Sequence, residues 1–313
     1  MRRKTLVQLH RSIVPIRGLP AALAGMRIVH LSDLHLSVWT DVVEQTQQLL
    51  STLELDLLVV TGDFSHNPPE WRKTLDLLAR FFDPIASVAP IYGVLGNHDL
   101  PQVAEHHQSP IRFLRNESTV IRFNGAEVRL AGVEQVFDVS PHSEQGLRDL
   151  EKTLTLSANA HGDPTRPTGR NIPTILLAHF PSTVYNLPNG VAQRPPAAIP
   201  AVPEMPGRGR PGYAVDLVLS GHTHGGQIRL PGLGCIWAND AIPLSLARGL
   251  HRAGGTLLHT SAGIGVSGPL RLRLNCPAEL TLLSLQPTRL IGPTASRPTG
   301  PPPPRPPRVL SGV

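Results

Sequence analysis

Five short apolar segments of this 313-residue chain each end at polar residues that can bind a metal ion. They cover residues 27–32, 56–61, 91–95, 174–178 and 215–219. Nearly uninterrupted apolar, β-branched runs of this length are typical of strands buried on both faces. In open α/β sheets, the side chains that follow the carboxyl ends of the strands gather at one edge. The pattern therefore predicts an α/β fold in which five sequence-distant segments meet at one site.

Other patterns extend this architecture. The sequence Asn124-Gly125 separates two alternating segments, residues 119–123 and 127–131, and is the strongest short signal for a β-hairpin. Amphipathic spacing predicts helices, and short apolar runs predict further strands. The expected helices cover 41–53, 69–82 and 142–155, and the expected strands cover 227–230, 257–260 and 280–285.

The composition divides the chain into one domain and two ends. We expect a catalytic domain over residues 27–286, a basic extension over 1–26 and a disordered Pro-rich tail over 287–313. Within the domain, residues 188–213 are rich in Pro, Gly and Arg without periodicity, which is typical of an insertion. Residues 33–286 hold 19 Lys and Arg against 23 Asp and Glu, a net charge of −4. A catalytic region of this charge disfavours nucleic acid as the partner.

The expected location follows from two absences in the sequence. No run of 18 apolar residues is present, so no membrane-spanning helix is expected. The basic N-terminal region is followed by no continuous apolar segment of the kind found in signal peptides. We therefore expect a cytoplasmic protein, and the basic ends leave open a peripheral attachment at the inner membrane face. The sequence gives no indication of the oligomeric state.

The residues that follow the five strands form a mixed nitrogen and oxygen ligand set without thiolates: Asp33, His35, Asp63, Asn97, His179, His222 and His224. Such a set suits Mn²⁺, Fe or Zn²⁺, of which we favour manganese. Seven ligands are too many for one ion, whereas one bridging carboxylate would give each of two ions about four. A two-metal centre can generate a hydroxide nucleophile and hold the oxygens of a phosphoryl group during in-line displacement.

Together these motifs resemble, in order, those of the calcineurin-like metallophosphoesterase superfamily. The matching segments are Asp33-x-His35, Gly62-Asp63, Gly96-Asn97-His98-Asp99, His179 and Gly221-His222-x-His224, and the resemblance spans roughly residues 27–285. The extended sequence Gly-His-Thr-His-Gly-Gly-Gln is similar to a bacterial branch often associated with membranes or envelope lipid metabolism. The resemblance implies a four-layer α/β/β/α sandwich.

The resemblance also implies a role for each motif residue. Asp33, His35 and His224 would hold one ion, Asn97, His179 and His222 would hold the other, and Asp63 would bridge them. A hydroxide bridging the two ions would attack phosphorus. His98 would protonate the leaving group as a general acid, and Asp99 would orient the imidazole of His98.

We therefore expect a hydrolase that cleaves a phosphodiester, pyrophosphate or phosphomonoester bond in a small or lipid-linked substrate. His66 stands where many members of the superfamily have an acidic residue, and some nuclease-type members also have a histidine there. A metal-dependent nuclease is therefore one alternative. A non-catalytic metal-binding scaffold that uses its polyproline tail is another. The histidines outside the motifs, including His30 and His259, are assigned to polar-surface or helix-capping positions.

Overall fold

The computed structural model describes residues 6–107, 109–136, 139–159, 172–187, 214–268 and 271–288. Two six-stranded mixed sheets form its centre. The first sheet has the order β1 (Val7–Ile16), β14 (Ala278–Pro287), β2 (Arg27–Leu31), β3 (Leu57–Thr61), β4 (Ile91–Val94) and β5 (Arg112–Phe113). The second has the order β12 (Gly249–Ala253), β13 (Thr256–Thr260), β9 (Leu217–Ser220), β8 (Thr174–Leu177), β7 (Ala126–Gly132) and β6 (Glu117–Phe123).

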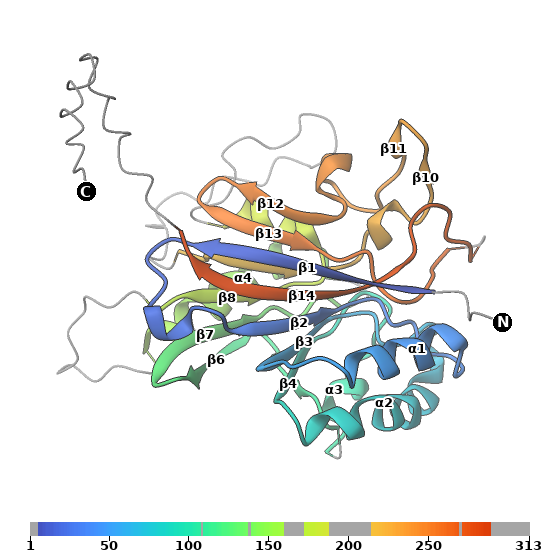
Figure 1. Cartoon of the computed structure of the whole chain (residues 1–313), viewed down its shortest axis with the longest axis horizontal. Helices are drawn as coiled ribbons and strands as arrows, with labels where there is room; N and C mark the ends of the chain where they lie inside the picture. Colours follow the sequence, from blue (N-terminus) through green and yellow to red (C-terminus); the bar gives the residue numbers. More distant parts are fainter. Residues whose placement is uncertain are drawn as a thin grey trace, which may run out of the picture.

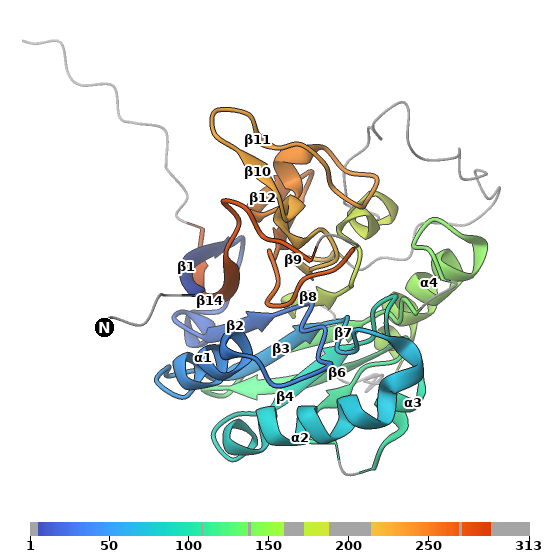
Figure 2. The ribbon, with the colours of Figure 1, turned by 90° about the vertical axis from the view of Figure 1, so that its right-hand side faces the viewer.

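Helices cover the outer face of each sheet (Figures 1 and 2). The first sheet carries α1 (Asp41–Leu50) and α2 (Trp71–Ala86), and the second carries α4 (Glu144–Asn159). The side chain of Thr40 caps α1 by accepting a hydrogen bond from the amide of Val43. The chain therefore forms the predicted four-layer α/β/β/α sandwich. Short elements complete the described part of the chain: α3 (Gln102–Glu105), the hairpin of β10 (Arg229–Leu230) and β11 (Gly234–Cys235), and several 3-10 turns.

The central strands bury side chains on both faces. In β3, Leu57 and Val59 point into the layer between the two sheets, whereas Leu58 and Val60 pack against the helical layer. In β8, Ile175 points into the layer between the sheets and its neighbours alternate in the same way. This double burial explains why the strands read as continuous apolar runs in the sequence.

Parallel pairing brings the motif segments to one end of the sandwich. β2, β3 and β4 run parallel in the first sheet, and β7, β8 and β9 run parallel in the second. The segments that follow these strands also bond to one another. The amide of His35 donates to the carbonyl of Asp63 at 2.9 Å, and the amide of Gly221 donates to the carbonyl of His179 at 3.0 Å.

The first sheet begins earlier in the chain than the sequence predicted. Within residues 1–26, which we expected to form an extension outside the domain, Val7–Ile16 form β1 and pair in parallel with β14. Val14 and Ile16 lie in the layer between the sheets. The polar residues of this segment and Pro15 interrupt the apolar pattern that would indicate a strand in the sequence. An edge strand tolerates them, because its outer side needs no hydrogen-bond partner.

Two buried histidines connect the sheets, which corrects their assignment to surface or capping positions. His30 of β2 and His259 of β13 are both buried, and their Nδ1 atoms lie 2.9 Å apart. Nε2 of His30 lies 2.8 Å from the hydroxyl of Thr61. Burial lowers the pKa of both histidines, that of His259 to about 4. Two neutral imidazoles can share one proton as donor and acceptor, so this polar pair is satisfied inside the core.

Two parts of the predicted organisation lie outside the described residues. These are the insertion at 188–213 and, from residue 289 onward, the tail predicted over 287–313. The start of that tail was wrong, because Pro287 pairs with Ile16 and belongs to β14. Within the described ranges, no helix combines the length and the apolar character needed to cross a bilayer.

The position of β1 predicts opposite results for two adjacent substitutions. Val14 is fully buried, whereas Ile13 is 67% exposed. Val14→Asp should lower the free energy of unfolding by about 3–5 kcal/mol, because the new charge is buried without a partner. Ile13→Asp should change it by less than about 1 kcal/mol. Urea denaturation measures both values, and equal effects would show that β1 does not belong to the folded domain.

Candidate metal centre

The predicted site residues come from both sheets. Asp33 and His35 follow β2, Asp63 follows β3, and residues 97–99 follow β4. His179 follows β8, and His222 and His224 follow β9. The amide of His222 donates to the carboxylate of Asp33 at 3.1 Å, so the second sheet is bonded to the first at the site itself.

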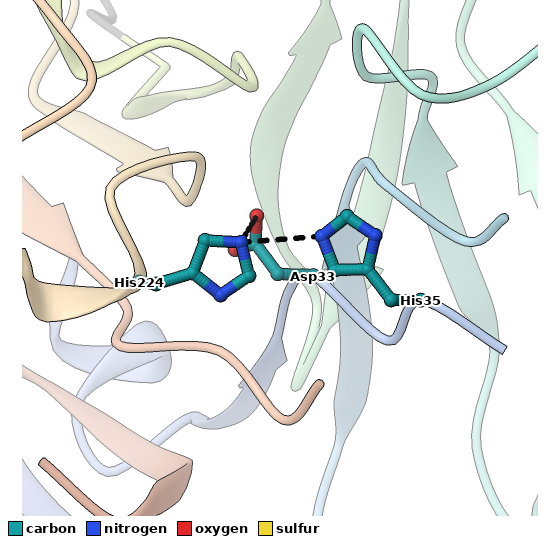
Figure 3. A group of neighbouring side chains, drawn as sticks. All are labelled: Asp33, His35 and His224. Atoms are coloured by element: carbon teal, nitrogen blue, oxygen red, sulfur yellow. Dashed lines mark hydrogen bonds and ion pairs between the residues drawn. The ribbon is translucent and has the colours of Figure 1, made fainter. Parts of the chain in front are cut away.

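One group of ligand atoms belongs to Asp33, His35 and His224 (Figure 3). These atoms lie within 4.8 Å of one another, and all three residues are buried. Nε2 of His35 lies 3.2 Å from Nε2 of His224, which in turn lies 3.6 Å from Oδ1 of Asp33. Figure 3 shows the two rings turning these nitrogens toward each other.

A second group belongs to Asp63, His179 and His222, again within 4.8 Å. Nδ1 of His222 and Nε2 of His179 are 3.2 Å apart, and Nε2 of His179 is 3.3 Å from Oδ2 of Asp63. The amide oxygen of Asn97 lies 3.0 Å from the same nitrogen of His179. The structure thus brings together all seven residues that the sequence nominated as ligands.

The carboxylate of Asp63 lies between the two groups. Its Oδ2 atom is 3.5 Å from Nε2 of His35 in the first group and 3.3 Å from Nε2 of His179 in the second. Its Oδ1 atom accepts a hydrogen bond of 2.8 Å from the amide of His98. Asp63 is therefore placed where one carboxylate can serve two ions.

Hydrogen bonds to backbone carbonyls orient two of the imidazoles. Nδ1 of His179 lies 2.8 Å from the carbonyl of Thr61, and Nε2 of His222 lies 2.5 Å from the carbonyl of Asn239. A carbonyl only accepts, so these nitrogens carry the hydrogens. In the neutral rings, the lone pairs then lie on Nε2 of His179 and Nδ1 of His222, the two atoms that face each other. A cation between them satisfies both.

Burial keeps several of these rings neutral. Burial lowers the pKa of His35 and of His222 to about 3, and it lowers that of His224 as well. Burial also raises the pKa of the carboxyl group of Asp33 to about 6. Neutral imidazoles and carboxylates that converge without thiolates fit Mn²⁺, Fe or Zn²⁺.

Asp63 and His179 behave as an ion pair in the metal-free protein. Burial by itself would raise the pKa of Asp63, but His179 and His35 hold it well below its usual range. Burial by itself would lower the pKa of His179, but Asp63 and Asp33 raise it to about 9. A proton therefore occupies His179 in the absence of a cation.

Most of the ligand residues have left-handed backbone conformations. Asp33, His35, Asp63, His222 and His224 have φ values of 51°, 44°, 54°, 65° and 51°. Non-glycine residues rarely adopt these angles, and each costs about 1–3 kcal/mol unless the surroundings enforce it. The sequence gives no direct signal of this strain, because hydrogen bonds between loops distant in sequence, such as that from His35 to Asp63, hold these residues.

Two glycines allow the loops to approach the ligands closely. A Cβ atom on Gly62, whose φ is +87°, would lie 2.6 Å from Nδ1 of His179. A Cβ atom on Gly96 would collide with the carboxylate of Asp63. These positions need glycine because a candidate metal ligand occupies the space of a side chain.

Three further residues lie around the two groups. The rings of His98 and His66 lie 4.9 Å and 5.7 Å from the ring of His35. The carboxylate of Asp99 accepts from the amides of Ser65 at 2.9 Å and Gly96 at 3.0 Å. Asp99 thus connects the loops after β3 and β4, a contact that the sequence analysis did not predict. Its expected role in orienting His98 stays a prediction.

A partly buried cation, Arg273, lies beside the site and was not among the predicted site residues. Arg273 contacts Nδ1 of His224 at 3.3 Å and donates to the carbonyl of Ala262 at 2.8 Å. Its only sequence signal is the alternation Arg271-Leu272-Arg273-Leu274, which places residues 271 and 273 on opposite sides from their leucine neighbours.

A four-layer sandwich with two neighbouring Asp/His groups at the ends of its strands agrees with a metallophosphoesterase. The model of the family "Calcineurin-like phosphoesterase" matches residues 26–226, and the chain belongs to this family. It is therefore a hydrolase that acts on phosphoester bonds.

Individual relatives extend the comparison. The chain is 27% identical to "Phosphodiesterase YaeI" of Escherichia coli, over 84% of this chain and 83% of that protein. It is 26% identical to "UDP-2,3-diacylglucosamine pyrophosphatase LpxG" of Chlamydia trachomatis, over 84% of each chain. It is 24% identical to "Uncharacterized metallophosphoesterase YkoQ" of Bacillus subtilis, again over 84% of each chain.

The ion pair of Asp63 and His179 predicts that metal binding releases a proton. Because the pKa of His179 is about 9 without metal, a cation must displace this proton at lower pH. The affinity for Mn²⁺ should therefore rise about tenfold per unit from about pH 7 toward pH 9. Calorimetric titration in buffers of different ionisation enthalpy counts the protons released. An affinity that is flat across this range would contradict the assignment.

Proposed function

We propose that this protein hydrolyses a phosphodiester or pyrophosphate bond in a small or lipid-linked substrate, using two divalent cations. The observation that supports this most directly is the position of the Asp63 carboxylate, whose Oδ2 atom lies within 3.5 Å of a histidine nitrogen in each ligand group. A site for one structural ion would need no such sharing, whereas two-metal hydrolysis does.

The proposed ligand assignment follows the two groups. Asp33, His35 and His224 would hold one cation, and Asn97, His179 and His222 would hold the other, with Asp63 common to both. We favour manganese because the set combines imidazole nitrogen with carboxylate and amide oxygen. Bound cations would supply Lewis-acid activation of the attacking water and of the phosphoryl oxygens.

The protein's own residues would donate the proton and hold the candidate ligands in place. His98 is only partly buried, and its ring lies beside the first group, so it can reach a leaving oxygen and donate a proton to it. Its backbone amide holds Asp63 through Oδ1. The carboxylate of Asp99 keeps the loop that carries both His98 and Asn97 against the loop of Asp63.

The substrate class rests on the relatives and on the charge of the domain. One relative is named a phosphodiesterase, and another is named a pyrophosphatase of a diacylated sugar nucleotide. The deficit of basic residues over 33–286 argues against a long polyanionic substrate. A peripheral position at the inner membrane face, in the cytoplasm, fits a lipid-linked substrate.

A metal-dependent nuclease is the second candidate, and one observation favours it. The partly buried ring of His66 lies 5.7 Å from the ring of His35, so it can contact a bound substrate. Steeply salt-dependent binding of single-stranded DNA by the full chain would favour this alternative.

Metal dependence is the first test of the proposed function. The protein loaded with Mn²⁺ should hydrolyse bis(p-nitrophenyl) phosphate, lose this activity on exhaustive chelation and regain it when Mn²⁺ is restored. Asp63→Asn should lose both ions, measured as metal content per chain. Activity that survives chelation would refute the proposal. A parallel assay with lipid-linked pyrophosphates, phosphomonoesters and single-stranded DNA assigns the substrate class.

Replacement of His98 tests the proton donor. His98→Ala should keep the metal content of the wild type and lower turnover by ~10²–10⁴, the usual contribution of general acid catalysis. His107→Ala is a suitable control, because this exposed histidine lies outside both ligand groups. Turnover of the His98 variant near that of the control would remove His98 from the proposed role.

A further inference from the structure

One surface of the protein is unusually apolar. Ten large apolar side chains are exposed in the described part of the chain, and six of them come from residues 230–237 and 272–274. The most exposed are Leu233 at 75% and Trp237 at 69%, and the others are Leu230, Ile236, Leu272 and Leu274. Single exposed apolar residues are common on proteins, but a contiguous group marks an interaction surface.

The two segments form one structural unit, which we call the apolar hairpin surface (residues 229–237 and 271–275). β10 and β11 pair through Arg229 and Cys235. The amide of Arg229 also donates to the carbonyl of Leu274 at 2.9 Å, and the side chain of Asn275 donates to the carbonyl of Arg229 at 3.0 Å. Figures 1 and 2 both show the β10–β11 hairpin extending from the body of the molecule.

The second segment exposes both of its leucines. Leu272 and Leu274 are exposed, whereas the side chain of Arg273 between them turns inward to backbone carbonyls, including that of Ala262 at 2.8 Å. Arg271 and Asn275 are exposed as well, so Arg273 is the one inward side chain among residues 271–275. The inward arginine holds the segment in place, so the exposed leucines are a fixed feature of the surface.

This surface adjoins the metal centre. The turn His224–Gly226 contains a ligand residue and leads directly into β10. The guanidinium of Arg229 donates to the carbonyl of Gly225 at 3.0 Å, and that of Arg273 contacts Nδ1 of His224 at 3.3 Å. A molecule bound at the apolar hairpin surface is therefore held next to the ligand groups.

The positive charge of the apolar hairpin surface indicates an anionic partner. Residues 229–237 and 271–275 contain the arginines Arg229, Arg271 and Arg273 and no acidic residue. Arg271 is exposed, and Arg229 is partly exposed. Apolar side chains that include a tryptophan, accompanied by arginines and no acidic residue, match the interface of a bilayer that contains anionic lipids.

We propose that the apolar hairpin surface docks the protein on an anionic lipid bilayer and so brings the metal centre to a lipid-borne phosphoester. The docking element is then the β10–β11 hairpin beside the active site, rather than the basic ends of the chain. This inference rests on the proposed function, because docking serves a substrate that resides in the membrane.

Vesicle sedimentation tests the docking surface directly. The full-length protein should bind vesicles of equal parts phosphatidylcholine and phosphatidylglycerol more tightly than vesicles of phosphatidylcholine alone. The double variant Leu233→Ser/Trp237→Ser should bind the mixed vesicles at least about tenfold more weakly than the wild type, since it loses the inserted apolar area. The matched control Ile13→Ser/Val88→Ser removes two equally exposed apolar residues elsewhere and should bind as the wild type does.

A soluble substrate separates docking from catalysis. Both double variants should hydrolyse bis(p-nitrophenyl) phosphate at the wild-type rate, which also shows that they are folded. If the wild type and the hairpin variant bind vesicles equally, or if the wild type binds none, the docking proposal is overturned while the proposed function stands. If vesicle binding is as expected but no phosphate ester is cleaved, the proposed function is refuted and the docking surface stands.

A second copy of the chain is the competing occupant of this surface. Sedimentation velocity distinguishes it. A wild-type dimer that Leu233→Ser/Trp237→Ser converts to a monomer would assign the surface to self-association and overturn docking on lipid. A wild type and a variant with the same oligomeric state, combined with the loss of vesicle binding in the variant alone, would support it.

Discussion

The organisation of this protein depends on one buried carboxylate. Asp63 follows β3 of the first sheet, yet its partners include His179, which follows β8 of the second. A buried negative charge is costly unless opposite charges and hydrogen-bond donors surround it. Here the surrounding groups are the rings of His35 and His179 and the amide of His98. The two sheets must therefore pack in one relative position for this charge to be tolerated. The same packing brings the two ligand groups together.

Unfavourable backbone conformations at the site are stabilised by the surrounding sandwich. Five ligand residues hold left-handed conformations, and backbone hydrogen bonds on both sides keep them there, such as that from His35 to the carbonyl of Asp63 at 2.9 Å. The rigid strands supply this restraint, because their side chains are buried on both faces. Preorganised ligands need little rearrangement when a cation binds, which is the usual use of strain at a functional site.

Much of this architecture could be predicted from sequence, because its signals are local. Each central strand is an apolar run that ends at polar residues, so the α/β class and the seven candidate ligands that the structure brings together follow from the pattern. The missed features depend on tertiary contacts. The strand β1 contains polar residues that only an edge position tolerates. The pair His30 and His259 is separated by 229 positions in the sequence, and the hydrogen bonds of Asp99 depend on where two loops meet.

The position of β14 between β1 and β2 has a consequence for biosynthesis. All seven ligand residues lie before residue 225, but the strand that joins β1 to the first sheet spans Ala278–Pro287. A nascent chain therefore carries its full set of ligands on the ribosome before it can complete the sheet that supports Asp33 and His35. The final arrangement of these candidate ligands thus awaits the translation of β14, and incomplete chains present them without the frame that orders them.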